Sequence, residues 1–210
     1  MKIDRIVAGA YETNCYIVRE SESAKECIII DTGFESGQVL QFLAANELRP
    51  VAVFLTHGHI DHTGGVGALL QEYPQIKVYV HKLDSKMLND AQSNLSAFLG
   101  MPQVIETANI TVDQSDIIEQ AGITLEVIHI PGHTPGGMSL YNKQDGVVFV
   151  GDSLFADSVG RTDFPQGSAK LLISGIKEKL MALPDDTAVY PGHGGRTTIG
   201  REKTHNQYLL

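Results

Sequence analysis

The chain has 210 residues, of which 42% are hydrophobic and 20% charged, as in an ordinary soluble globular protein with a sizeable core. Its formal net charge of −9 opposes functions that depend on attraction to nucleic acid phosphates or to an anionic membrane surface. No stretch approaches the roughly 20 apolar residues of a membrane helix, and the start lacks the apolar run of a secretory signal. We therefore expect a single cytoplasmic domain spanning residues 1–210.

Short apolar runs alternate with helical patterns along the chain. In the first half, strands are predicted over residues 3–7, 14–18, 27–31, 51–55 and 77–80, and helices over residues 37–47 and 64–73. In the second half, strands are predicted over residues 123–130, 138–141, 147–150 and 188–190, with a helix over 170–183 and a helical tail from residue 199. Strands follow helices in some places and other strands elsewhere, which predicts an α/β layered domain with mixed sheets.

Residues 84–100 carry apolar side chains at helical spacing, and the sequence leaves their role open. The positions that would share one helical face are Met87, Leu88, Ala91, Leu95, Phe98 and Leu99. Such a helix would pack in the core, or it would form a lid over a substrate cleft between two strand-rich halves.

The motif THGHIDH follows the fourth predicted strand and is the strongest chemical signal in the chain. In an extended segment, side chains two residues apart point the same way, so His57 and His59 converge on one ion. The turn that follows lets Asp61 and His62 aim at a second point nearby. Imidazole nitrogens and carboxylate oxygens suit zinc, iron or manganese. By chance, this spacing would occur in such a chain on the order of one time in a thousand. The alternative interpretation, in which these are solvated loop histidines without a ligand, is therefore disfavoured.

Three later strand ends add further polar residues. PGHTPG places His133 in a tight turn, GDS places Asp152 after a strand, and YPGHG places His193 near the end of the chain. Each has a neighbouring glycine, as expected where the backbone turns sharply and approaches another group closely. Taken alone, each is an ordinary strand-end turn. Together with THGHIDH they provide enough ligands for two ions, with Asp152 as the bridge between them.

These motifs, in this order and spacing, resemble the metallo-β-lactamase superfamily, above all its small glyoxalase II-like hydrolases (hydroxyacylglutathione hydrolases). The resemblance covers nearly the whole chain, including GDSLF, GRTDF at residues 160–164 and THN at residues 204–206. It implies an α/β fold that is a four-layer αβ/βα sandwich of two mixed β-sheets flanked by helices. It also implies two divalent metal ions, zinc in the first place and iron or manganese as alternatives. One ion would be held by His57, His59 and His133, and the second by Asp61, His62 and His193, with Asp152 shared.

Two further residues receive supporting roles. Asp31, in IDTG at a strand end, matches a position that supports the ligands by hydrogen bonding, although a turn-forming aspartate is the alternative. Arg161 follows a glycine-flanked loop behind Asp152 and is predicted to hold an anionic part of the substrate, with a solvated surface arginine as the alternative. Gly137 stands where many relatives carry a second histidine, which changes the substrate pocket and leaves the metal ligands intact.

The expected activity is hydrolysis of a small thioester of the hydroxyacylglutathione type. An activated water, steadied by Asp61 or Asp152 as catalytic carboxylates, would attack the carbonyl. The alternatives are a persulfide (sulfur) dioxygenase with one iron, a lactonase or a phosphodiesterase of the same fold. A binding protein without catalysis is disfavoured because all seven candidate ligands are retained. The expected partner is a small-molecule substrate, and no nucleic acid or membrane partner is expected.

Overall fold

The computed structural model describes residues 1–106 and 109–210 and contains two six-stranded mixed sheets. The strands of the first sheet, in spatial order, are β1 (Lys2–Ala8), β2 (Thr13–Arg19), β3 (Glu26–Ile30), β4 (Arg49–Leu55), β5 (Lys77–His81) and β6 (Asn109–Val112). The first three strands pair antiparallel, whereas β3 to β6 run parallel. The carboxyl ends of these parallel strands therefore meet at one edge of the sheet.

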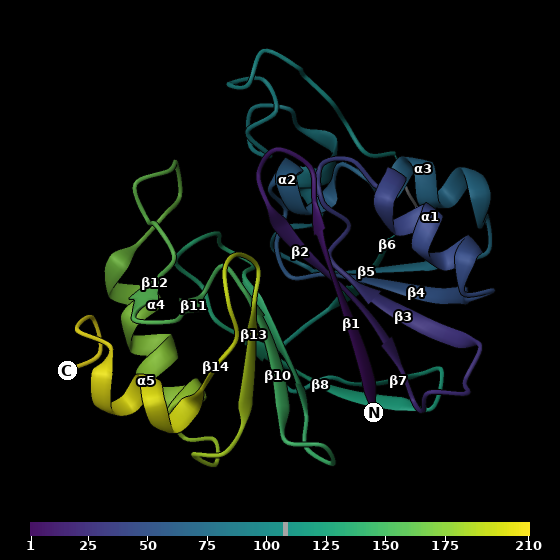
Figure 1. The fold of residues 1–210 in the computed structure, drawn as a ribbon. Coiled ribbons are helices and arrows are strands. Elements are labelled where there is room, and N and C mark those ends of the chain that lie inside the picture. Colours follow the sequence, from purple (N-terminus) through teal and green to yellow (C-terminus); the bar gives the residue numbers. More distant parts are fainter. Residues whose placement is uncertain (107–108) are drawn as a thin grey trace.

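The second sheet is built mostly from the C-terminal half of the chain (Figure 1). Its strands, in spatial order, are β14 (Thr197–Thr198), β13 (Ala188–Pro191), β10 (Val147–Gly151), β9 (Met138–Asn142), β8 (Ile123–His129) and β7 (Ile117–Gln120). β10 and β13 are parallel, and the other neighbours are antiparallel. A small hairpin, β11 (Leu154–Phe155) and β12 (Ser158–Val159), follows β10.

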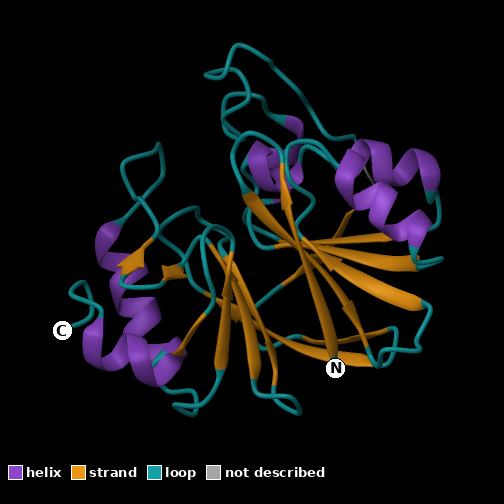
Figure 2. Ribbon diagram, in the orientation of Figure 1, coloured by secondary structure: helices purple, strands orange, loops and turns teal. Residues whose placement is uncertain are grey.

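Helices cover the outer face of each sheet, as Figure 2 shows. On the first sheet these are α1 (Gly37–Ala45) and α3 (Val66–Glu72), and on the second α4 (Ala169–Gly175), which continues as a π-helical turn, and α5 (Ile199–His205). A four-residue helix, α2 (Ile60–Thr63), lies between β4 and α3. Among the described residues, no helix is long and apolar enough to cross a lipid bilayer.

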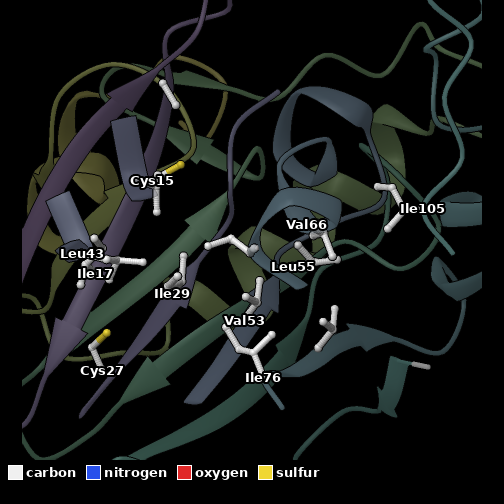
Figure 3. Close-up of a cluster of buried hydrophobic side chains, with 14 of the residues drawn as sticks. Cys15, Ile17, Cys27, Ile29, Leu43, Val53, Leu55, Val66, Ile76 and Ile105 are labelled. Carbon is white, nitrogen blue, oxygen red and sulfur yellow. The ribbon is translucent and has the colours of Figure 1, made fainter. Parts of the chain in front are cut away.

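The period-two alternation of the strands divides their apolar side chains between separate layers. Ile17, Ile29 and Val53 of the first sheet pack outward against Leu43 of α1 and Val66 of α3 (Figure 3). The opposite faces of the two sheets form a second layer, with members such as Tyr16, Ile28, Phe54, Leu125, Leu140 and Phe149. A third layer lies between the second sheet and its helices, with members such as Ile130, Val148, Leu172, Ile176 and Ile199. The four-layer αβ/βα sandwich expected from the sequence is confirmed.

All strands and helices predicted outside residues 84–100 are present, with ends that differ by a few residues. The prediction omits β6 and β7, which have four residues each. In β7, Ile117 is 63% exposed, whereas the adjacent Ile118 packs against the inner layer. Two neighbouring apolar residues thus stand where a half-buried strand usually alternates apolar and polar residues.

The expected helix over residues 84–100, for which packing in the core and a lid were both open, is not formed. Ser85–Asn89 forms a short 3-10 helix, and the chain then continues to residue 100 in turns. The reason is that Asn94 and Ser96 are fully buried and their side chains bond to the backbone of Ser96 and Gln103. Side chains that satisfy local backbone groups in this way compete with helix formation. Phe98, expected in the core, is 68% exposed.

Candidate metal centre

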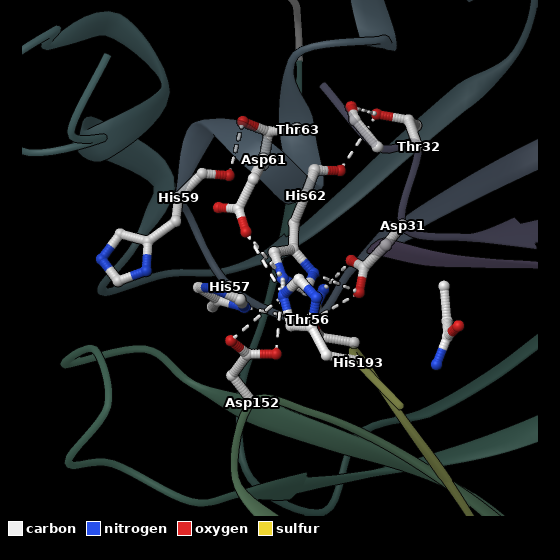
Figure 4. A network of polar contacts seen from close by, with 12 residues as sticks. Asp31, Thr32, Thr56, His57, His59, Asp61, His62, Thr63, Asp152 and His193 are labelled. Atoms are coloured by element: carbon white, nitrogen blue, oxygen red, sulfur yellow. Dashed lines mark hydrogen bonds and ion pairs between the residues drawn. The ribbon is translucent and has the colours of Figure 1, made fainter. Parts of the chain in front are cut away.

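Four chain segments bring histidine and aspartate side chains together where strands of both sheets end. The first segment follows β4, and the other three follow β8, β10 and β13. In Figure 4, the side chains of Asp61, Asp152 and His193 converge on His62. A side chain at Gly192 would collide with the Asp152 carboxylate, so the glycine of YPGHG lets two of these segments approach each other closely.

The first cluster consists of His57, His59 and His133, whose candidate ligand atoms all lie within 4.8 Å of one another. His59 Nδ1 and His133 Nε2 are 3.0 Å apart. Burial and the neighbouring His133 lower the pKa of His59 to about 3, and burial lowers the pKa of His57 well below its usual value. Both rings are therefore neutral at pH 7, which is the form of imidazole that binds a metal ion.

The second cluster consists of Asp61, His62, Asp152 and His193. Candidate ligand atoms of His62, Asp152 and His193 lie within 4.8 Å of one another, and those of Asp61 and His62 lie equally close to His57. His62 Nε2 is 3.2 Å from His193 Nε2, and Asp61 Oδ2 is 3.3 Å from the same His193 atom. Asp152 lies between the two clusters, with its Oδ1 3.4 Å from His62 Nε2 and its Oδ2 3.7 Å from His133 Nε2. This carboxylate is placed to contact an ion in either cluster.

The donor atoms fit divalent metal ions. His57 Nε2 is buried and has no hydrogen-bond partner among the described residues. A buried polar atom without a partner is costly, and a metal ion at the centre of the first cluster would satisfy it. Imidazole nitrogens mixed with carboxylate oxygens are the donor set of zinc, iron and manganese sites. The structure thus brings together all seven side chains that the sequence singles out, while their individual roles as ligands stay predictions.

Asp31 lies directly behind the second cluster. His62 donates from Nδ1 to Asp31 Oδ2 at 2.9 Å, which leaves Nε2 facing the cluster. Thr56 donates to the same carboxylate from its backbone N and from Oγ1, both at 2.8 Å. The residue also has a positive φ of 56°, which aspartate tolerates better than most side chains. The structure therefore places Asp31 where the predicted supporting hydrogen bond requires it.

Asp84 is a structural link that the sequence prediction missed. Its buried carboxylate accepts hydrogen bonds from Gly58 N at 3.0 Å, from Thr134 Oγ1 at 2.7 Å and from Gly136 N at 2.5 Å. Gly58 lies between the first two histidines of THGHIDH, and the other two donors flank the turn of His133. One side chain thus joins the loops that carry the whole first cluster. The sequence holds no motif around Asp84 that could have identified it.

A cavity of about 820 Å³ opens beside the two clusters. His59, His133, Asp61, Asp152 and His193 all reach its surface. Most other lining side chains are apolar, and they come from the first hairpin, the segment after the 3-10 helix, the β11–β12 hairpin and the loop after it. They include Tyr11, Leu95, Phe98, Leu99, Phe155 and Phe164. The volume lies in the range of small-molecule sites.

Arg161 lies at this cavity, as predicted, and it is already paired. Its Nε and Nη2 each donate to the Asp163 carboxylate at 2.7 Å, and its guanidinium lies 4.0 Å above the Phe164 ring centroid. Its backbone oxygen also accepts a hydrogen bond from His133 Nδ1 at 2.8 Å. The predicted contact between Arg161 and an anionic part of the substrate stays a prediction.

Comparison with known proteins identifies the family. The model of the metallo-beta-lactamase superfamily matches residues 8–193. The chain is 34% identical to the hydroxyacylglutathione hydrolase GloC of Haemophilus influenzae over 211 residues, covering 100% of this chain and 98% of the relative. The chain belongs to the metallo-β-lactamase superfamily, whose members are hydrolytic enzymes.

Solved structures agree with this assignment. The BLEG-1 B3 metallo-beta-lactamase is similar with a TM-score of 0.93 and 34% identity, covering 100% of both chains. TTHA1623, crystallised in a di-iron-bound form, is similar with a TM-score of 0.86 and 33% identity, covering 98% of this chain and 100% of that chain. Because that neighbour holds iron, zinc stays a prediction for this chain.

Proposed function

We propose that this protein is a binuclear metal-dependent hydrolase that cleaves a small thioester of the hydroxyacylglutathione type. The observation that carries the proposal is the convergence of seven histidine and aspartate side chains into two adjacent clusters at the floor of a cavity. Similarity to GloC along the full length of the chain supports a thioester as the substrate class.

The two clusters would hold the metal ions, with Asp152 between them. Bound ions would supply a water with a pKa near neutrality and would polarise the substrate carbonyl. Asp61 lies at the cavity with its Oδ2 3.3 Å from His193 Nε2, and this carboxylate would accept a proton from the attacking water. The water oxygen bonds to the carbonyl carbon, the carbon–sulfur bond breaks, and the thiol leaves as the thiolate or takes up the proton held by Asp61. Asp152, whose oxygens lie 3.4 Å from His62 Nε2 and 3.7 Å from His133 Nε2, would contribute a carboxylate ligand to both ions.

The cysteines of the chain do not provide a nucleophile for this reaction. Cys15 and Cys27 are free and fully buried. Burial raises the pKa of the Cys15 thiol well above its usual value and raises that of Cys27 to about 12. Neither thiol is ionised at pH 7, and neither lines the cavity. Direct attack by water therefore accounts for hydrolysis without a covalent cysteine intermediate.

Metal analysis combined with a substrate panel tests this function. We expect two metal ions per chain and hydrolysis of S-lactoylglutathione in preference to lactones and phosphodiesters. Asp61→Asn should bind the substrate yet lose most of kcat, because the amide cannot take up the proton. The metal content of this variant is measured as well, because Asp61 is also a candidate ligand of the second ion. One iron per chain with oxygen uptake on glutathione persulfide would contradict the proposal and indicate a dioxygenase. Metal-loaded protein that cleaves none of the thioesters would also contradict it.

A further inference from the structure

We propose that the cavity selects thioesters that carry an extended apolar group, on the acyl or on the thiol side. This inference rests on the proposed thioester hydrolysis and adds the part of the substrate that determines specificity. The apolar group would bind against the apolar wall of the cavity, which consists of Tyr11, Leu95, Phe98 and Leu99.

The apolar wall is unusually open to solvent for such large side chains. Phe98 is 68% exposed, Leu99 is 39% exposed and Tyr11 is 38% exposed, and all three line the same cavity as the metal clusters. Clustered apolar side chains in contact with water mark binding surfaces, because a ligand that covers them removes their apolar area from water. The wall is continuous with the floor formed by Asp61 and His59, so a group bound there would lie next to the reacting carbonyl.

The backbone holds Leu95 at the cavity in an unfavourable conformation. Its φ is +71°, a left-handed value that a bulky side chain rarely adopts. Asn94 Oδ1 accepts from Ser96 N and Asn94 Nδ2 donates to Gln103 O, both at 2.9 Å, so buried hydrogen bonds fix the turn on either side of Leu95. The backbone N of Ile60 donates to Asn94 O at 2.9 Å, which ties this turn to THGHIDH. Strain that surrounding contacts maintain in this way is typical of functional sites.

The cavity walls offer few basic side chains to an anionic substrate. Among the described residues that line it, Arg161 is the single arginine or lysine. Its guanidinium is paired with Asp163, and both side chains are exposed, at 60% and 68%. Bound divalent ions would offset the carboxylates of Asp61 and Asp152 at the floor. Arg161 thus offers one side-chain contact to the carboxylates of a glutathione thioester, and the other side chains of the cavity that could add binding free energy are mostly apolar.

Two substrate series distinguish the acyl side from the thiol side. The metal-loaded protein is assayed with N-acetylcysteamine thioesters of acetate, butyrate, hexanoate and octanoate, and with acetyl thioesters of thiols of increasing length. A fully buried methylene contributes about fourfold to affinity, so partial burial in an open cavity predicts at least a roughly tenfold rise in kcat/KM over four methylenes. A rise in either series supports the proposal and identifies the side, whereas a flat profile in both contradicts it.

Variants connect this chain-length effect to the apolar wall. Leu95→Gly removes the side chain and relieves the positive φ, so it should keep the wild-type unfolding temperature while it loses most of the chain-length effect. Phe98→Ala, at an exposed position, should also keep the wild-type unfolding temperature and lose most of the chain-length effect. Ile117→Ala is the matched control, because this residue is 63% exposed on β7 and does not line the cavity. Chain-length discrimination that survives both wall variants would contradict the assignment.

Binding of thioethers separates this inference from the proposed reaction. Calorimetry with S-hexylglutathione and S-methylglutathione measures the contribution of the apolar wall without any bond cleavage. We expect the hexyl compound to bind at least about tenfold more tightly to the wild type and the difference to vanish in Leu95→Gly. This result without thioester hydrolysis would contradict the proposed function alone. Hydrolysis with equal affinity for both compounds would exclude the acyl side, and together with a flat thiol series it would contradict the apolar wall alone.

Discussion

Asp84 joins the loop of His57 and His59 to the turn of His133, so Asp84→Asn should weaken both the fold and metal binding. The carboxylate accepts three hydrogen bonds, two at Oδ2 and one at Oδ1. An amide keeps one acceptor oxygen and turns its NH2 group toward a donor, so at least one buried donor loses its partner. That loss lowers the free energy of unfolding by about 1–3 kcal/mol. The remaining hydrogen bonds become neutral instead of charge-assisted, which brings the total decrease to about 2–4 kcal/mol.

Two measurements test the role of Asp84. For a chain of this length, the loss should lower the unfolding temperature of the metal-free protein by roughly 5–15 °C in calorimetry. Chelator competition should show metal binding weakened about 10–100-fold, as for other partners that orient ligands. Asp185→Asn is the matched control, since Asp185 is 74% exposed and pairs only at the surface with Lys203. Wild-type stability together with wild-type metal affinity in Asp84→Asn would refute the reasoning.

Three other changes test separate parts of the account. Removing the metals with a chelator should abolish hydrolysis. It should also lower the unfolding temperature, because ions that bind only the folded state stabilise it. Activity that persists without metal would contradict this expectation. Asp31→Asn weakens the hydrogen bond that orients His62 and should lower metal affinity about 10–100-fold in chelator competition, whereas unchanged affinity would limit Asp31 to a turn-forming role. Arg161→Ala should raise KM for S-lactoylglutathione several-fold and leave kcat nearly unchanged in steady-state assays; an unchanged KM would show that Arg161 does not touch the substrate.

The candidate ligands could be predicted because each lies in a short motif at the end of a strand. THGHIDH holds four of them within six residues, and PGHTPG, GDS and YPGHG add one each. The carboxyl ends of β4 and of the parallel pair β10 and β13 then bring motifs that are distant in sequence to one place. Local sequence and the topology rules of mixed sheets agree, so the layered fold could also be predicted.

What the sequence did not reveal depends on contacts between distant residues. Asp84 bonds to Thr134, 50 positions away, and neither residue stands in a pattern that predicts the bond. The helical spacing of residues 84–100 was misleading because Asn94 and Ser96 turn inward and bond the backbone, which leaves Leu95 and Phe98 at the cavity. Periodicity reports which residues are apolar, but it does not report which polar side chains find buried partners.

The central claim is that two metal ions occupy the two clusters and share Asp152. Anomalous diffraction from crystals of the metal-loaded protein tests this most directly, because it locates the ions independently of any assay. We predict two peaks at coordinating distance, about 2.0–2.3 Å from the ligand atoms, one among His57, His59 and His133 and the other among Asp61, His62 and His193. Ions bound elsewhere, a single ion in place of two, or two ions that do not both contact Asp152 would contradict the claim.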